Sequence, residues 1–161
     1  MKLFEPDKIL DKYQDLDIAE LKEMGIKYIF MDIDNTLAPY YEAVADDNAK
    51  EFIAKLLNAD LKIILVSNNK EYRVKTFAES IPLPYHYFSL KPLPFTYNKL
   101  VKQHKLSKNE VLCMGDQLLT DVLGARLAGL RVYYTKPLVD KDSFSTKINR
   151  KIERIIMRNY Q

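Results

Sequence analysis

The sequence predicts a three-layer α/β/α fold with a mostly parallel central sheet. Short apolar runs typical of buried strands recur along the chain, and amphipathic stretches of helical length separate them. Strands that alternate with helices are typical of parallel sheets with right-handed crossovers, covered by helices on both faces. With 161 residues, 47% of them hydrophobic, the chain can bury one sizeable core, so we expect a single domain over residues 1–161.

The N-terminal part is expected to contain one helix and the first strand. Residues 6–16 are a short mixed segment, in which we expect a turn of helix that covers an edge of the sheet. Asp17 and Glu20 have the spacing of a capping box, and Gly25 can end the following helix in the left-handed conformation. The apolar run over 27–32 then predicts a buried strand.

The middle of the chain predicts three helices and two strands. Residues 46–58 place their large apolar side chains on one helical face, and the aliphatic run 62–66 predicts a second buried strand. A helix is expected over 71–79, because prolines follow it, and a short third strand over 85–89. A further helix fits 94–104, where the proline stands at a tolerated first-turn position.

The C-terminal third predicts two more strands and two helices. The apolar run 111–114 and the aromatic run 131–134 have the composition of strands. Between them we expect a helix over 115–128 with Gly129 as its cap. The last helix is expected over 145–161, and it is basic and amphipathic.

Polar side chains follow each of the first four predicted strands. Side chains two residues apart on an extended chain point the same way, so Asp32 and Asp34 should lie together at the end of the first strand. Two carboxylates that close need a cation between them or a shared proton. Because ligands of open α/β sheets bind outside the carboxyl ends of the strands, we expect these groups to converge on one crevice. They are Asp32, Asp34, Ser67, Asn68, Lys91, Asp116 and Asp121.

The chemistry of this set suits a phosphate ester bound together with Mg²⁺. Carboxylates are ligands for a hard cation, whereas a lysine and short hydroxyl or amide donors suit phosphoryl oxygens. His86 and His104 do not belong to the set, since one lies in a predicted strand and the other on the apolar side of a helix. No Cys/His spacing suggests zinc.

Four motifs, in order along the chain, resemble those of the haloacid dehalogenase (HAD) superfamily of phosphohydrolases. They are Asp-Ile-Asp-Asn-Thr at 32–36, Val-Ser-Asn at 66–68, Lys-Pro at 91–92 and Gly-Asp-Gln-Leu-Leu-Thr-Asp at 115–121. One such motif is a weak indication, but four in order at strand ends are a strong one. The resemblance covers most of the chain and is closest to the small, nearly capless YqeG-like phosphatases. It implies the Rossmann-like HAD fold and Mg²⁺-dependent phosphatase activity.

The resemblance also implies a role for each central residue. Asp32 would be the nucleophile, which forms an aspartyl-phosphate and so divides one difficult displacement into two. Asp34 would be the general acid and then the base, while its backbone carbonyl helps to bind Mg²⁺. Lys91 would neutralise charge on Asp32 and on the transferring phosphoryl group. Asn35 is expected to be a turn residue.

Supporting roles are implied for the remaining members. Ser67 and the adjacent Asn68 amide would hold phosphoryl oxygens, and Thr36 would support Asp34 or the loop. Asp116 would complete the Mg²⁺ ligands, and Asp121 would orient Lys91 or a metal-bound water. Taken singly, these hydroxyl, amide and carboxylate groups are ordinary helix caps and helix-start acids, but their joint arrangement favours a site.

The spacing of the motifs indicates an open site. The segments 36–62 and 67–91 hold little more than a loop, a helix and a short strand, so neither can contain a cap domain. An open crevice favours a phosphate on a large or surface-bound molecule. Some relatives of this family resemble phosphatidylglycerophosphate phosphatases, which makes a lipid phosphate the substrate hypothesis.

The positive charge of the chain lies in its tail. Residues 145–161 carry five basic side chains and one acid, against a net charge of +3 for the whole chain. Ile148, Ile152, Ile155 and Ile156 have helical spacing, and basic amphipathic helices can lie on anionic membranes. The simpler alternative, a terminal helix that packs on the domain, is favoured.

Location and two alternative functions follow from the same patterns. No apolar segment approaches the ~20 residues that span a bilayer, and the N-terminus lacks a signal peptide's apolar region, so we expect a cytoplasmic protein with peripheral membrane contact as a hypothesis. A receiver-like phospho-aspartate signalling module is disfavoured, because receivers phosphorylate an Asp after the middle strand. Nucleic-acid binding is not expected, since the basic tail has no aromatic platform.

Overall fold

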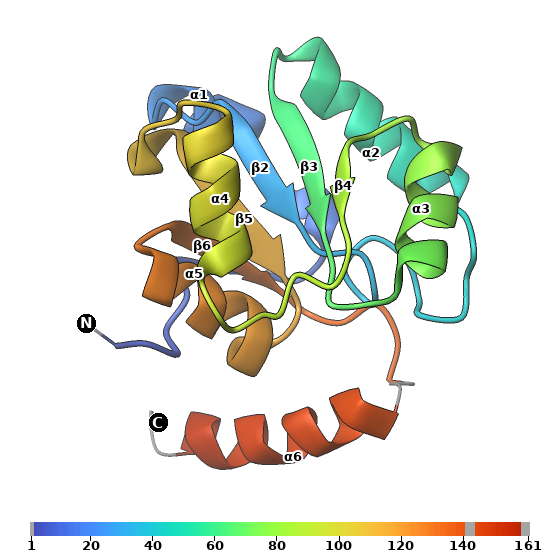
Figure 1. The fold of residues 1–161 in the computed structure, drawn as a ribbon, viewed down its shortest axis with the longest axis vertical. Helices are drawn as coiled ribbons and strands as arrows, with labels where there is room; N and C mark the ends of the chain where they lie inside the picture. The colour runs from blue at the N-terminus through green and yellow to red at the C-terminus, as the bar shows by residue number, and fades with distance from the viewer. Residues whose placement is uncertain (1, 141–143, 159–161) are drawn as a thin grey trace.

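Six parallel strands form one sheet in the order β1-β6-β5-β2-β3-β4 (Figure 1). The computed structural model describes residues 2–140 and 144–158. The prediction of a mostly parallel α/β/α fold is confirmed. The strands are β1 (Lys8–Leu10), β2 (Tyr28–Met31), β3 (Lys62–Val66), β4 (Tyr85–His86), β5 (Val111–Gly115) and β6 (Arg131–Thr135).

Helices cover both faces of the sheet, and each face has its own apolar core. Ile29 and Met31 of β2 pack with side chains of three helices on one face, whereas Phe30 between them packs with two helices on the other. The first face is covered by α1 (Ile18–Glu23), α2 (Asp47–Asn58) and α3 (Glu71–Ser80), and the second by α4 (Phe95–Gln103) and α5 (Leu123–Ala128).

Local capping signals account for several helix ends. The Asp17 side chain accepts a hydrogen bond from the Glu20 amide at 3.1 Å and begins α1, as predicted. Gly25 follows the helix with φ 74°. Gly129 ends α5 with φ 72°, also as predicted.

The segment 6–16 differs from the prediction. Instead of a helical turn alone, it contains the edge strand β1, followed by a 3₁₀ turn over Tyr13–Asp15. Lys8 and Leu10 pair with Tyr133 and Thr135 of β6 in parallel. Three residues are too few to show the hydrophobic alternation of a strand, so the sequence did not indicate β1. The strand forms because this segment pairs with the edge of β6.

Two further elements have different bounds from those expected. The third predicted strand ends at His86, because the chain then turns sharply, with Phe88 and Leu90 at φ 47° and 58°. The predicted helix 115–128 begins as a π-helical turn over Leu118–Val122 before α5. This turn shapes the site described below.

The C-terminal helix α6 (Phe144–Arg158) lies across the end of the molecule to which the strands point (Figure 1). Its Ile148, Ile152 and Ile155 are 52%, 44% and 61% exposed, while Glu153 is buried. The favoured expectation of packing on the rest of the chain therefore holds, but the packed face is polar. Residues 159–161 of the predicted tail lie outside the described residues. Among the described helices, none combines the length and the apolar character needed to span a bilayer.

Helix α3 provides a test of the core. Phe77 is fully buried, whereas Tyr72 on the same helix is 84% exposed. We expect Phe77→Ala to lower the free energy of unfolding by about 3–5 kcal/mol, because the cavity it leaves cannot fully collapse. Tyr72→Ala should change it by less than about 0.5 kcal/mol. Urea denaturation followed by circular dichroism measures both values, and equal losses would contradict the packing of α3.

Candidate active site

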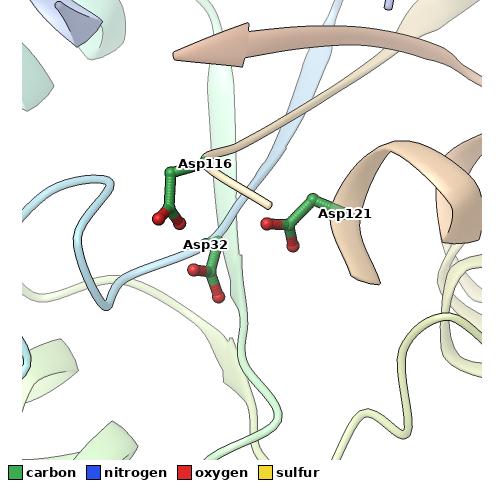
Figure 2. A group of neighbouring side chains, drawn as sticks. All are labelled: Asp32, Asp116 and Asp121. Atoms are coloured by element: carbon green, nitrogen blue, oxygen red, sulfur yellow. The ribbon is translucent and has the colours of Figure 1, made fainter. Parts of the chain in front are cut away.

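Three buried carboxylates lie together beyond the carboxyl ends of β2 and β5 (Figure 2). Oxygens of Asp32, Asp116 and Asp121 lie within 4.8 Å of one another. Asp32 and Asp116 directly follow the central strands β2 and β5, and Asp121 comes from the π-helical turn. The strand ends therefore bring together residues that are far apart in the sequence, as predicted.

The surroundings of these acids disfavour their charged forms. Burial raises the pKa of Asp32 to about 7, although Lys91 lowers it, and Asp121 and Asp34 raise it further. Burial, and then the charge of Asp32, raises the pKa of Asp116 well above its usual value. A hard divalent cation among these oxygens would favour the charged carboxylates. The donor set fits such an ion.

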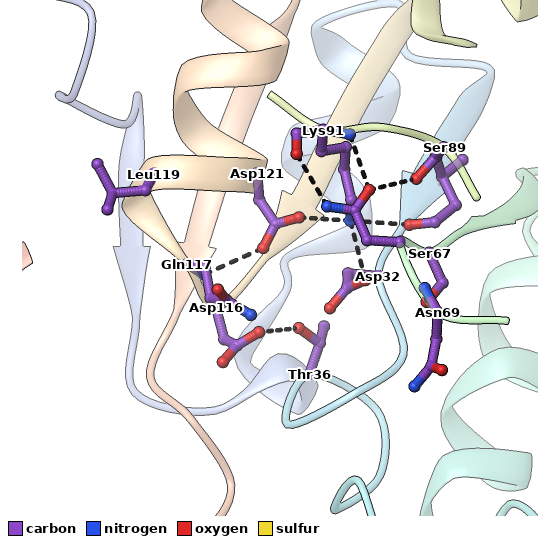
Figure 3. Close-up of polar contacts among 12 residues, drawn as sticks. Asp32, Thr36, Ser67, Asn69, Ser89, Lys91, Asp116, Gln117, Leu119 and Asp121 are labelled. Atoms are coloured by element: carbon purple, nitrogen blue, oxygen red, sulfur yellow. Dashed lines mark hydrogen bonds and ion pairs between the residues drawn. The ribbon is translucent and has the colours of Figure 1, made fainter. Parts of the chain in front are cut away.

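Lys91 is the buried cation of the site (Figure 3). Its Nζ donates to Asp32 Oδ1 at 2.9 Å, to Asp121 Oδ1 at 2.6 Å and to the Val66 carbonyl at 2.9 Å. Burial lowers the pKa of Lys91, but Asp121 and Asp32 outweigh it and hold the pKa well above its usual value. The ammonium thus stays charged beside Asp32, and Asp121 orients it as expected.

Asn68 holds the loop that carries Lys91. Its Oδ1 accepts hydrogen bonds from the Lys91 amide at 2.7 Å and from Ser89 Oγ at 3.0 Å. Its Nδ2 donates to the Lys91 carbonyl at 2.8 Å. The sequence predicted that Asn68 contacts phosphate, and it did not predict this positioning role for the side chain.

Two hydroxyl groups have partners other than those expected. Thr36 Oγ1 donates to Asp116 Oδ1 at 3.0 Å, so it supports Asp116 rather than Asp34. Ser67 Oγ accepts a hydrogen bond from the Asn69 amide at 3.1 Å and so also helps to shape the turn after β3. Both side chains are buried at the strand ends, where they were predicted.

The Asp34 carboxylate points to α3 and its preceding turn. Asn69 Nδ2 donates to Asp34 Oδ2 at 2.9 Å, and Arg73 donates to Oδ1 from Nη2 at 2.9 Å and from Nε at 3.1 Å. Sequence reasoning missed Asn69 and Arg73. Their position in the sequence could have indicated them, because Asn69 lies in the turn that follows Ser67 and Arg73 lies in the first turn of α3. Asn35, beside Asp34, has φ 60° and is the turn residue expected.

Gly115 is required by the way Asp121 folds back. A Cβ atom at Gly115 would lie 2.2 Å from Asp121 Cγ, which is far closer than van der Waals contact. Asp121 Oδ2 also accepts a hydrogen bond from the Gln117 amide at 3.0 Å. The glycine and the π-helical turn together therefore allow the Asp121 carboxylate to reach Lys91.

A cavity of about 390 Å³ opens onto these groups. Asp32, Asp34 and Lys91 line it from the sheet side, and Thr146 and Asn149 line it from α6. The predicted nucleophile, proton donor and lysine thus share one cavity. The space is large enough for a phosphoryl group and part of its leaving group.

Comparison with known proteins identifies the family. The family model described as mitochondrial PGP phosphatase matches residues 1–139. The chain belongs to this family. A curated relative, the probable phosphatase YqeG of Bacillus subtilis (strain 168), is 35% identical over 156 residues, covering 97% of this chain and 91% of its own. The YqeG-like HAD phosphatase resemblance is confirmed, and the chain is a phosphoric monoester hydrolase rather than a receiver-like module.

Solved structures of other phosphatases share the fold. The cobalt-bound deoxy-D-mannose-octulosonate 8-phosphate phosphatase of Haemophilus influenzae has a TM-score of 0.58 at 17% identity, covering 80% of this chain and 77% of its own. The core domain of a putative phosphoglycolate phosphatase from Streptococcus pneumoniae has a TM-score of 0.54 at 16% identity, covering 80% and 96%. At these identities the likeness concerns the fold alone.

In this phosphatase, α6 places a second cation against the buried acids. The Arg150 guanidinium donates to the carboxylate and to the backbone carbonyl of Asp116. Glu153 accepts a hydrogen bond from Arg150 at 3.2 Å and another from the Leu119 amide at 3.1 Å. The sequence left membrane contact of the basic tail as a hypothesis and favoured packing on the domain, and the Arg150 side chain is turned into the site.

Arg150 binds the carboxylate that the sequence predicts to be a metal ligand. Thr36 donates to Asp116 Oδ1 and Arg150 donates to Oδ2, so both oxygens of this carboxylate have a donor. A cation bound to Asp116 would meet the positive guanidinium at the same group. A metal ion bound to Asp116 would therefore compete with Arg150 for this carboxylate.

We expect Arg150→Ala to raise the affinity for a divalent cation. A hydrogen bond to a charged group contributes about 1.5–3 kcal/mol, so the apparent Kd should fall about tenfold or more. Electron paramagnetic resonance of free Mn²⁺ in a titration measures the affinity without any turnover. Lys151→Ala, on the exposed side of the same helix, is the control and should match the wild type. Unchanged or weaker binding by Arg150→Ala would contradict the competition.

Proposed function

We propose that this chain is a Mg²⁺-dependent phosphatase that hydrolyses a phosphate monoester through an aspartyl-phosphate on Asp32. The observation that carries the proposal is the contact between Asp32 and the buried Lys91 at the floor of the cavity. A buried carboxylate held by a fixed ammonium is suited to attack a phosphorus atom, because the same ammonium can neutralise the charge of the transferring group. The carboxylate of Asp116 close to Asp32 supports the metal dependence.

In the first step, Asp32 attacks the phosphorus atom and the bond to the leaving oxygen breaks. Lys91 donates to Oδ1, which leaves Oδ2 of Asp32 to form the new bond. Asp34 starts this step with a proton on Oδ2, because Oδ1 is held by Arg73, and gives that proton to the leaving oxygen. In the second step, Asp34 takes a proton from water, the water oxygen attacks phosphorus, and the bond to Asp32 breaks. Inorganic phosphate leaves and both aspartates return to their initial state.

The metal would be held by the carboxylates of Asp32 and Asp116 and by the backbone carbonyl of Asp34. Bound there, Mg²⁺ would supply positive charge against the phosphoryl oxygens. Asp121 stays with Lys91, to which it is bound at 2.6 Å. Ser67 and the Asn68 backbone would face the phosphoryl oxygens from the turn after β3. Arg73 and Asn69 fix the Asp34 carboxylate at the side of the cavity.

Replacement of the nucleophile tests this function directly. Asp32→Asn should lower the hydrolysis of an aryl phosphate in the presence of Mg²⁺ by at least about a thousandfold, because the amide cannot form the intermediate. Wild-type hydrolysis should also be lost on chelation of the metal. Asp47→Asn, an exposed acid on α2, is the control and should remain active. An Asp32→Asn protein that is folded and still active would contradict the proposal.

We further propose a lipid phosphate, with phosphatidylglycerophosphate as the first candidate, as the substrate. The description of the family supports this choice. The cavity between the strand ends and α6 would let a headgroup phosphate enter while the acyl chains stay in the bilayer. The exposed isoleucines of α6, with Lys147, Lys151, Arg154 and Arg158 on the same helix, would provide peripheral contact with an anionic membrane.

The substrate class is tested by release of inorganic phosphate. Phosphatidylglycerophosphate in vesicles should be hydrolysed with a kcat/KM about tenfold or more above that of soluble glycerol 3-phosphate, because only the lipid gains from surface binding. Wild type and Asp32→Asn are compared on both substrates. A preference for the soluble ester would exclude the lipid substrate while it leaves the phosphatase activity intact.

A further inference from the structure

The segment between β4 and the beginning of α4 exposes large apolar side chains and carries the cavity residue Lys91. We define the 87–95 loop as residues 87–95, which lie at the same end of the molecule as α6 (Figure 1). Between its exposed side chains, Ser89 and Lys91 are buried. The exposed members are Tyr87 (39%), Phe88 (56%), Leu90 (56%), Leu93 (47%) and Phe95 (66%).

The backbone of the loop is bent so that these side chains face outward. Phe88 and Leu90 have φ 47° and 58°, a left-handed conformation that bulky residues rarely adopt. The amides of Phe88 and Ser89 donate to the carbonyls of Asn69 and Ser67, both at 3.1 Å, which holds the bend in place. Backbone strain of this kind is concentrated in functional segments. Exposure of several neighbouring large apolar side chains is likewise typical of surfaces that bind a partner or a membrane.

The loop and the sequence on either side of it carry basic side chains only, apart from the acids of the site that Lys91 contacts. From residue 81 to residue 109 the sequence contains no aspartate or glutamate and five lysines. Lys91 is buried in the site, whereas Lys99 and Lys102 are exposed on α4. Lys99 and Lys102 lie four and seven residues after Phe95, so the three side chains share one helical face. An apolar tip bordered by lysines without acids complements an anionic bilayer.

We propose that the 87–95 loop inserts into the interfacial region of an anionic lipid bilayer, with Lys99 and Lys102 beside the headgroups. The inference deepens the lipid-phosphatase function proposed above and names a membrane contact separate from α6. Because the same loop carries Lys91, insertion brings the cavity to the level of the headgroup phosphates. A lipid phosphate then reaches Asp32 without leaving the bilayer.

The absence of tryptophan from the chain allows a direct test. Phe88→Trp introduces a single fluorescent reporter at the tip of the loop. Its emission should shift to the blue and be quenched by brominated lipids on vesicles of phosphatidylcholine with phosphatidylglycerol. Leu57→Trp, near the end of α2 from which the chain enters β3, is the control and should not respond, since Leu57 is 45% exposed against 56% for Phe88. An unresponsive Phe88→Trp on vesicles that do bind the protein would assign the contact to α6 alone and overturn the proposal.

A second variant measures the contribution of the loop to binding. Phe88→Ser with Leu90→Ser should lower binding to these vesicles about tenfold or more, because two apolar side chains are lost from the contact. Equal binding by this variant, or equal wild-type binding to phosphatidylcholine alone, would overturn the proposal. If wild type forms a dimer in sedimentation experiments and the variant does not, the 87–95 loop binds a second copy of the chain, which would also overturn the proposal.

Hydrolysis of a soluble aryl phosphate separates the two proposals. It should be unchanged in the double variant, since neither Phe88 nor Leu90 is among the residues that line the cavity. Failure of wild type to hydrolyse the aryl phosphate would count against the phosphatase function. Normal hydrolysis with undiminished vesicle binding by the variant would count against the loop alone.

Discussion

The contact of Lys91 with Asp32 and Asp121 is the interaction on which the rest of the site depends. Three carboxylates buried this close together would be strongly unfavourable without a cation among them. The ammonium makes two ion pairs, at 2.9 and 2.6 Å, and a third bond to a backbone carbonyl. Asn68 fixes the loop of Lys91, and Gly115 leaves space for Asp121. These features appear unrelated in the sequence, yet each serves to place one ammonium group.

The charge balance of the site explains why it fits a metal ion. Lys91 and Arg150 bring two positive charges to Asp32, Asp116 and Asp121, and Arg150 also pairs with the buried Glu153. The raised pKa values of Asp32 and Asp116 reflect burial in the first place and repulsion between the acids in addition. A further cation would relieve this repulsion, whereas a neutral ligand would not. Arg150 adds positive charge against Asp116 and so opposes the rise of its pKa.

The features that could be predicted from the sequence are those that depend on local hydrophobic patterns and on the order of the strands. The buried strands around Asp32 and Asp116 are continuous apolar runs, so their ends, and the polar residues there, could be located from the sequence. Arg73 and Arg150 could not, because their contacts depend on how α3 and α6 pack against the sheet. The side-chain role of Asn68 was missed because its partners lie more than twenty residues away. The strand β1 was missed because three residues are too few to show the hydrophobic alternation of a strand.

The pairing of β1 with β6 has a consequence for how the chain folds. Lys8 lies opposite Tyr133, so the first strand of the chain joins the sheet beside one of its last segments. During synthesis, β2, β3 and β4 can associate while β1 still has no partner. Contacts of such long sequence separation form slowly and only after loop closure. The N-terminal edge of this sheet is therefore expected to be among the last parts to become ordered on the ribosome.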